Sequence, residues 1–250
     1  MKIITIFNFP DEENNNRLCN WWCEQTDKYR EGLPVEVWTK DFNSCLRYEL
    51  PQNFQLLEKK EVDAAAVLLP NAVTSKAQHN IGFKLYNLTQ ETEPFIFIDA
   101  DAILLDSVGP LIEASRDQPF IAVNHQKIEG HTAHIPVDFL NSGLQVWSDP
   151  SAMPTFDQLS SIKNFGLEYP GTDQSILNTV CRIAGYDYTH PDVGLGWNSC
   201  AGLTEVIDGE AFCNDRGFYY KVHLNHYWYS YKPWLIDCPL YNEYVRTKNE

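Results

Sequence analysis

Two aspartates, Asp99 and Asp101, come directly after an apolar run at residues 95–98. That run is aromatic and β-branched, which is typical of a strand buried on both faces of a sheet. Such a strand would bring both carboxylates to its C-terminal end, where they can converge on one hard cation if the backbone turns there. An unpaired carboxylate is costly to bury, so a bound divalent metal is one reason for two acids at this place. Turn formation at a strand end is the alternative reason.

Three further segments carry polar side chains that are suited to chemistry. They are D-F-L-N-S-G at residues 138–143, G-T-D-Q-S-I-L-N at 171–178 and H-Y-W-Y-S-Y-K-P-W at 226–234. Asn141, Ser142 and Gly143 interrupt an apolar stretch, and a glycine within a strand allows a ligand or a backbone to approach closely. Asp173 follows Thr172, a suitable helix cap, so its charge would lie at the positive end of a helix.

Strands and helices alternate in the part of the chain that must position these segments. The patterns predict strands at residues 2–9, 35–39, 95–98, 120–123 and 139–147, and helices near 17–29 and at 75–88, 106–115, 151–162 and 172–183. The order strand, helix, strand at the start indicates a nucleotide-binding α/β half. Residues 53–69 fit a helix or a strand, and residues 125–136 and 194–202 are expected to be loops.

The composition indicates one sizeable α/β domain or two closely packed halves. Hydrophobic residues make up 44% and charged residues 21% of the 250 residues, which excludes a disordered or fibrous chain. The formal net charge is -15. A nucleic-acid or anionic-membrane partner would require a basic surface, so the charge argues against both.

The cysteines and the apolar runs indicate the compartment. Seven cysteines without a C-x-x-C pair predict reduced thiols rather than a disulfide framework or a zinc site. The N-terminal apolar run is too short and too soon acidic for a signal peptide, and no later run reaches membrane-spanning length. The sequence therefore predicts a soluble, cytosolic protein without a transmembrane segment.

Taken together and in this order, the four motifs resemble those of the retaining sugar-nucleotide glycosyltransferases of family 8. That family contains glycogenin, bacterial lipopolysaccharide galactosyltransferases and galactinol synthase, and the resemblance covers about residues 75–235. It implies an α/β fold of the GT-A, Rossmann-like type, with a central mixed, mostly parallel sheet flanked by helices. It also implies one domain over residues 1–250, with a nucleotide-binding half at 1–106 and a donor-sugar and acceptor half at 107–250.

The resemblance implies a metal site and a cation for the diphosphate. Asp99 and Asp101 match the family's D-x-D metal ligands. His226 matches the histidine of the H-x-x-G-x-x-K-P-W signature, because Lys232 follows it by six positions. A third ligand of imidazole type favours Mn²⁺ over Ca²⁺, and Mg²⁺ is the alternative cofactor. Lys232 would reach the diphosphate, and His223 is a competing candidate for the third ligand.

The resemblance also assigns residues to the donor. Lys84, on the helix before the D-x-D strand, would help to neutralise the donor, with an ordinary solvated lysine as the alternative. Asp138 and Asn141, with the adjacent Ser142, match the segment that holds the hydroxyl groups of the donor sugar, and such contacts distinguish one hexose from another. Asn8, at the end of the first strand, is a candidate for contact with the nucleobase.

A last group of residues would lie at the reacting carbon and on the acceptor side. Asp173 and Gln174 match the Asp-Gln pair that the family places beneath the anomeric carbon, although Ser175 stands where an acid often follows. Asp173 could also be only a helix N-terminal acid. Trp197 and Asn198 fall where the family has an aromatic-Asn pair facing the acceptor.

The implied activity is transfer of a hexose from a nucleoside diphosphate sugar, expected to be a UDP-hexose, to a hydroxyl group of a glycan, a protein or a small polyol. Two alternatives stay open. The first is a catalytically degenerate sugar-nucleotide or glycan binder, because Tyr229 replaces the glycine of the family signature. The second is a phosphatase of the haloacid dehalogenase type, whose first strand also ends in D-x-D, although its later acidic motif is absent here.

Overall fold

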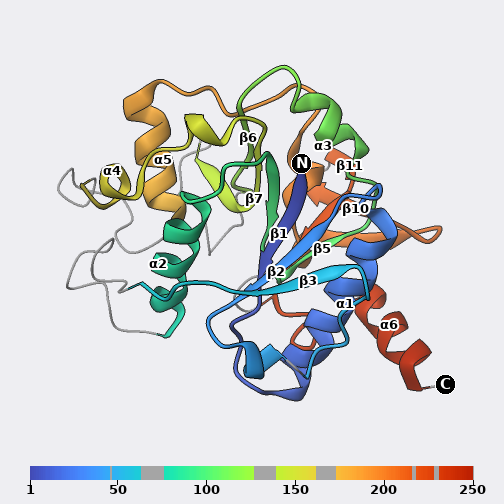
Figure 1. The fold of residues 1–250 in the computed structure, drawn as a ribbon. Helices are drawn as coiled ribbons and strands as arrows, with labels where there is room; N and C mark the ends of the chain where they lie inside the picture. The colour runs from blue at the N-terminus through green and yellow to red at the C-terminus, as the bar shows by residue number, and fades with distance from the viewer. Residues whose placement is uncertain are drawn as a thin grey trace.

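The computed structural model describes residues 1–45, 47–62, 76–126, 139–161, 173–215, 218–227 and 231–249. Its centre is a six-stranded sheet in the order β3-β2-β1-β4-β7-β6 (Figure 1). The strands are β1 (Lys2–Ile6), β2 (Val35–Thr39), β3 (Phe54–Glu58), β4 (Phe95–Ile98), β6 (Phe120–Asn124) and β7 (Leu140–Trp147). Strands β3, β2, β1 and β4 run parallel, and β7 is antiparallel to β4 and to β6. The expected mixed, mostly parallel sheet is confirmed, and residues 54–58 of the undecided segment form a strand.

Helices cover both faces of this sheet. On one face, α1 (Glu13–Tyr29) packs with Ile96 and Ile98 of β4; on the other, α2 (Lys76–Leu88) and α5 (Asp173–Ala184) pack with Phe95 and Phe97. Figure 1 shows α5 above α2, and the two helices are in contact. Because consecutive residues of a strand point to opposite faces, an all-apolar β4 fits only a position covered on both sides. The sequence prediction for this strand is confirmed.

Two smaller sheets and several short helices complete the described chain. One sheet contains β5 (Ala102–Leu104), β12 (Leu224–His226) and β8 (Ser199–Cys200), and the other contains β9 (Thr204–Ile207), β10 (Glu210–Asp215) and β11 (Phe218–Lys221). The short helices are η1 (Phe42–Cys45), α3 (Gly109–Ala114), η4 (Pro150–Ala152), α4 (Phe156–Ser161), η6 (Leu195–Asn198) and η7 (Ala201–Leu203). Strand β12 is antiparallel to β5 and places His226 opposite Ala102, next to the end of β4.

The helix predicted at residues 151–162 is wrong in its extent. The chain forms η4 and α4 instead, with Met153 in an extended conformation between them. Pro154 explains the break, because a proline disfavours helical geometry at the residue before it and has no N–H to donate.

The hairpin of β9 and β10 was not predicted, although the sequence carries a signal for it. Asp208 and Gly209 both have positive φ, at 52° and 83°, and join the two strands directly. An Asp-Gly pair between alternating residues is a strong hairpin signal, because this turn requires positive φ at both positions.

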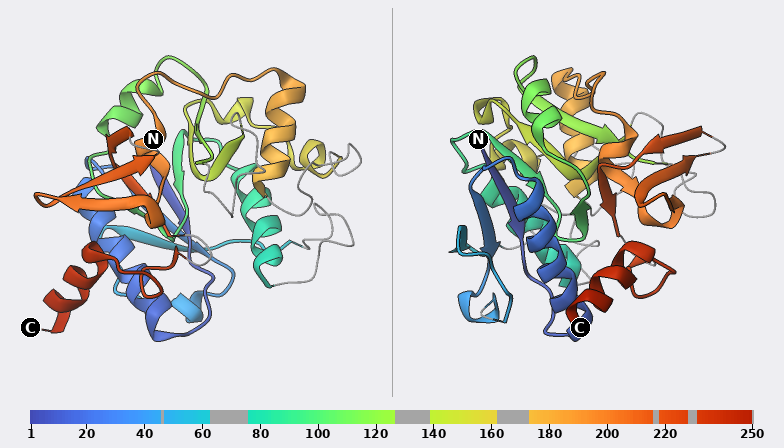
Figure 2. Two further views of the ribbon diagram at one scale, coloured as in Figure 1. Left: turned by 180° about the vertical axis from the view of Figure 1, so that it is seen from behind. Right: turned by 90° about the vertical axis from the view of Figure 1, so that its right-hand side faces the viewer.

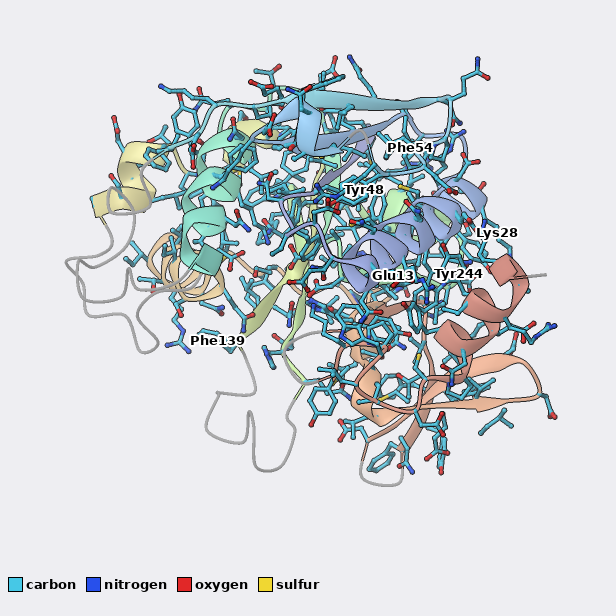
Figure 3. The ribbon with its side chains drawn as sticks, turned by 90° about the horizontal axis from the view of Figure 1, so that it is seen from below. Glu13, Lys28, Tyr48, Phe54, Phe139 and Tyr244 are labelled. Carbon is cyan, nitrogen blue, oxygen red and sulfur yellow. The ribbon has the colours of Figure 1, made fainter. Side chains whose placement is uncertain are left out.

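The C-terminal helix α6 (Pro239–Asn249) was not predicted either, and it packs on α1 through aromatic rings. The ring of Trp21 on α1 lies 5.5 Å from Tyr241, 5.7 Å from Tyr244 and 5.5 Å from Tyr227. Figure 2 shows the two helices next to each other, and Figure 3 labels Tyr244 where they meet. Trp21 therefore joins α1, α6 and the chain that follows β12.

Three further expectations can be compared with the structure. All seven cysteines are free, as predicted, and the structure buries each of them. Of the helices in the described ranges, none has both the length and the apolar character needed to cross a membrane. The division of one domain at residue 106 stays a prediction, and the central sheet takes strands from both sides of it.

We expect Trp21→Ala to lower the free energy of unfolding by about 3–5 kcal/mol, because it removes a 2%-exposed indole that holds two helices together. Chemical denaturation measures this. Phe218→Ala is the control: this side chain is 78% exposed, so the change should stay within about 0.5 kcal/mol. Similar values for the two variants would contradict the role of Trp21.

Candidate active site

Asp99, Asp101 and His226 come together at the end of β4. One potential ligand atom from each residue lies within 4.8 Å of the others, and Nε2 of His226 is 3.2 Å from Asp101 and 4.0 Å from Asp99. The backbone turns as the sequence argument required, since the N–H of Ala102 donates to the carbonyl of Asp99 at 2.9 Å. Two carboxylates and an imidazole are a donor set that suits a divalent ion such as Mn²⁺.

His223, the competing candidate, lies elsewhere. Its Nδ1 is 3.1 Å from a carboxylate oxygen of Asp106, and its ring stacks on Trp197 with the centroids 4.9 Å apart. The structure thus brings His226 to the two aspartates and pairs His223 with Asp106.

Lys232 supplies a cation beside the cluster. Its Nζ lies 2.5 Å from the carboxylate of Asp101. Burial by itself raises the pKa of Asp101, but the nearby Lys232 and His226 outweigh it and hold that pKa well below its usual range. Asp101 is therefore ionised at neutral pH, as a metal ligand must be.

Lys84 joins the cluster to α5. Its Nζ lies 3.0 Å from Asp99 and 2.8 Å from Asp173, and donates to the carbonyl of Ser142 at 3.0 Å. Only 6% of Lys84 is exposed, so the alternative of an ordinary solvated lysine is wrong. Burial lowers the pKa of Lys84, but Asp173 and Asp99 outweigh it and the pKa is raised.

The two carboxylates that bind Lys84 differ in their surroundings. For Asp173, burial favours protonation, but Lys84, the hydroxyl of Ser142 and the N–H of Gln174 hold the pKa below its usual value. Asp173 is also the first residue of α5, where the helix dipole favours negative charge. For Asp99, burial and the adjacent Asp101 outweigh Lys84, and the pKa is raised.

The interruption predicted in the strand at residues 139–147 is a bulge within a continuous β7. Its pairing with β6 skips residues 142–144, because Val123 faces Asn141 and Ala122 faces Gln145. The N–H of Gly143 donates to Oδ1 of Asn141 at 2.8 Å. A side chain at residue 143 would not fit, since a Cβ there would lie 2.4 Å from Cε1 of His226. Gly143 is thus what allows the imidazole to lie against β7.

Trp197 and Asn198 lie in the interior, with 2% and 3% of their surface exposed. Oδ1 of Asn198 is 2.9 Å from Nδ1 of His226. Sequence reasoning missed this contact, which joins residues 28 positions apart and has no local signal. The acceptor-facing role of the pair stays a prediction.

A pocket of about 290 Å³ opens beside these groups. Asn8 is one of its lining residues, and its Oδ1 accepts a hydrogen bond from the N–H of Lys40 at 3.0 Å. The pocket is lined by Ile6, Asn8, Phe9, Asn80, Ile81, Lys84, Asp99, Ala100, Asp101 and Asp173. It therefore combines apolar side chains with charged groups of the site.

Some predicted positions lie outside the described residues, namely Asp138, Thr172 and Tyr229. Ser175 is buried on α5, with 2% of its surface exposed.

Comparisons with known proteins identify the fold. No family model and no curated protein matches the sequence. Solved structures do match: the galactosyltransferase LgtC in complex with donor and acceptor sugar analogues superposes with a TM-score of 0.63 at 13% identity, covering 100% of this chain and 95% of that one. The chain has the GT-A-like fold of LgtC. An LgtC variant in which an active-site glutamine is replaced by glutamate gives a TM-score of 0.62 at 14% identity, covering 99% and 96%.

The LgtC-like fold confirms the GT-A architecture that the resemblance implied. The two solved structures are of a galactosyltransferase, so this likeness gives no support to the alternative of a phosphatase of the haloacid dehalogenase type.

We expect Gly143→Ala to weaken Mn²⁺ binding by about tenfold or more, because the new methyl group would displace the imidazole of His226. Calorimetry of the metal-free protein measures this. Gly194→Ala is the matched control, since a Cβ at residue 194 meets nothing within 4 Å. Native affinity in both variants would contradict the proposed contact.

We expect Lys84→Met to lower the free energy of unfolding by about 3–5 kcal/mol near neutral pH, since it leaves Asp99 and Asp173 without their buried cation. The exposed ion pair of Arg116 with Glu113 provides a control, and Arg116→Met should cost under about 1 kcal/mol.

The effect of Lys84→Met should depend on pH. The lowered pKa of Asp173 contributes stability above its unfolded-state pKa of about 3.9, and the raised pKa of Lys84 contributes below about 10.4. The difference between native protein and variant should therefore be largest between about pH 5 and 9 and shrink below about pH 4. A difference that grows on acidification would contradict this assignment.

Proposed function

We propose that this chain is a metal-dependent, retaining glycosyltransferase that transfers a hexose from a UDP-hexose to a hydroxyl group of a glycan, a protein or a small polyol. The observation that carries the proposal is the cluster of Asp99, Asp101 and His226 beside a pocket that the buried Lys84 lines, with the half-buried Lys232 paired to Asp101. The fold of LgtC, a galactosyltransferase solved with donor and acceptor sugar analogues, supports it.

The residues of the cluster suit Mn²⁺ or Mg²⁺. Asp99, Asp101 and Nε2 of His226 would hold the ion, because they offer two anionic oxygens and one imidazole nitrogen close together. When bound, the ion would act as a Lewis acid that stabilises the charge developing on the leaving diphosphate. Lys232 and Lys84 would add fixed positive charge on either side of the two aspartates.

The remaining predicted residues would hold the donor. Asn8 lines the pocket together with Ile6 and Phe9, and it would contact the nucleobase. Asn141, Ser142 and Asp138 would hold the donor sugar, and the backbone carbonyl of Ser142 already fixes Lys84.

Asp173 and Gln174 would act at the reacting carbon. The carboxylate of Asp173 would stabilise positive charge on the anomeric carbon electrostatically, and Lys84 and Ser142 keep it ionised. Gln174 would position the donor, because an amide is too poor a nucleophile for a double displacement. The acceptor hydroxyl would then attack from the face that the diphosphate leaves, and an oxygen of the β-phosphate would take its proton. The active-site glutamine of LgtC supports a role for Gln174.

Slow hydrolysis of the donor tests the activity without knowledge of the acceptor. We expect the native protein with Mn²⁺ to release UDP from at least one UDP-hexose, and His226→Ala or a chelator to abolish that release. Chromatography of UDP and free hexose measures it. If every UDP-hexose binds but stays intact, the chain is a sugar-nucleotide binding module and the proposal is wrong.

Gln174→Ala should lower the turnover number by about 10–100-fold with little change in UDP affinity, since a misplaced donor loses the aligned geometry of reaction. Gln158→Ala, at an exposed position on α4, is the control and should keep native turnover. Mass spectrometry should find no sugar attached to the native enzyme during turnover. A covalent adduct on Gln174 or Asp173 would contradict the single-step route.

A further inference from the structure

The two nitrogens of the His226 imidazole have different neighbours. Nε2 points to the carboxylates, 3.2 Å from Asp101 and 4.0 Å from Asp99. Nδ1 lies 2.9 Å from Oδ1 of Asn198. His226 and Asn198 are 7% and 3% exposed, so this contact is shielded from water.

The identity of the facing atom decides which nitrogen carries the proton. An amide oxygen can only accept, so the contact requires a hydrogen on Nδ1, and the neutral ring then has its lone pair on Nε2, the nitrogen that would bind a metal ion. With the amide turned over, Nδ2 of Asn198 would donate to Nδ1, and the neutral ring would carry its hydrogen on Nε2. That tautomer cannot bind a metal ion at Nε2.

The surroundings hold Asn198 in this place. It is the last residue of η6, and the following β8 pairs in parallel with β12, with Ser199 opposite Asn225 and Cys200 opposite His226. Gly196 allows η6 to pack closely against the backbone of Lys221, since a Cβ at residue 196 would lie 2.2 Å from the carbonyl oxygen of Lys221. The sheet register thus sets the position of Asn198 relative to His226.

The amide nitrogen of Asn198, Nδ2, supports a role for this side chain beyond packing. Nδ2 of Asn198 is buried and has no hydrogen-bond partner among the residues that the structure describes, and such a group destabilises a folded protein. An apolar side chain of similar size would avoid that penalty. What it could not provide is the acceptor for Nδ1 of His226.

We propose that Asn198 is a positioning residue for the metal site: its Oδ1 holds the hydrogen on Nδ1 of His226 and fixes the ring so that Nε2 is presented to the ion. This inference rests on the proposed function through His226 as a metal ligand. It assigns to Asn198 a task different from the acceptor contact expected from the sequence.

A double-mutant cycle with Mn²⁺ alone tests the inference. Mn²⁺ affinity is measured by electron paramagnetic resonance for the native protein, Asn198→Leu, Asn198→Asp, His226→Ala and both Asn198 variants in the His226→Ala background. We expect Asn198→Leu to weaken binding about 10–100-fold in the native background and less than threefold without His226. Asn198→Asp keeps an acceptor for Nδ1, so it should retain Mn²⁺ affinity within about threefold of native. Any change that the same substitution causes in the His226→Ala background is subtracted first.

Nitrogen NMR of labelled His226, with Mg²⁺ as the diamagnetic probe, gives a second measurement that does not depend on affinity. Native protein and Asn198→Asp should show a protonated Nδ1, and Asn198→Leu should show mixed tautomers. Native affinity and tautomer in Asn198→Leu, or equal losses in Asn198→Leu and Asn198→Asp, would overturn the inference while leaving the metal site in place. If His226→Ala itself binds Mn²⁺ as tightly as native protein, the metal site of the proposed function fails instead.

Discussion

The site depends on the electrostatic balance of three largely buried carboxylates. Asp99, Asp101 and Asp173 converge at one end of the central sheet, where each would be costly without a counter-charge. Lys84 lies between Asp99 and Asp173, and Lys232 binds Asp101. The raised pKa of Asp99 and the lowered pKa of Asp101 show that this balance is uneven. A divalent cation between Asp99, Asp101 and His226 would complete it, which is why the cluster carries our functional proposal.

The topology of the sheet explains how residues from distant parts of the chain meet there. Strand β4 lies at the centre of the sheet and delivers Asp99, and the turn after it delivers Asp101. The short sheet of β5 and β12 then returns the chain, so that His226 lies opposite Ala102. On the other side, α2 and α5 contact each other and bring Lys84 to Asp173. The bulge of β7 and the bare backbone of Gly143 leave room for the imidazole.

Much of this arrangement could be predicted from the sequence because its signals are local or belong to ordered motifs. The all-apolar run before Asp99 predicts a strand covered on both faces, and the motif order predicts the LgtC-like fold that the comparisons confirm. The spacing of Lys232 to His226 favoured His226 over His223, and the structure places His226 beside the two aspartates. The positions that could not be predicted depend on contacts across the fold. Examples are the contact of Asn198 with His226 and the packing of α6 on Trp21, where no periodicity or spacing indicates the partner. The hairpin at Asp208 and Gly209 is different, because its local signal was present.

Calorimetric titration of UDP into the metal-free protein, with and without Mn²⁺, for the native chain and for Asp101→Asn, would show whether the cluster holds a metal ion for the nucleotide. Asp117→Asn is the matched control, since the Asp117 side chain is 77% exposed and lies outside the cluster. We expect tight UDP binding only when Mn²⁺ and Asp101 are both present, with native behaviour in the control. UDP binding that is independent of Mn²⁺, or unchanged in Asp101→Asn, would contradict it and leave the aspartates as turn residues of a shared fold.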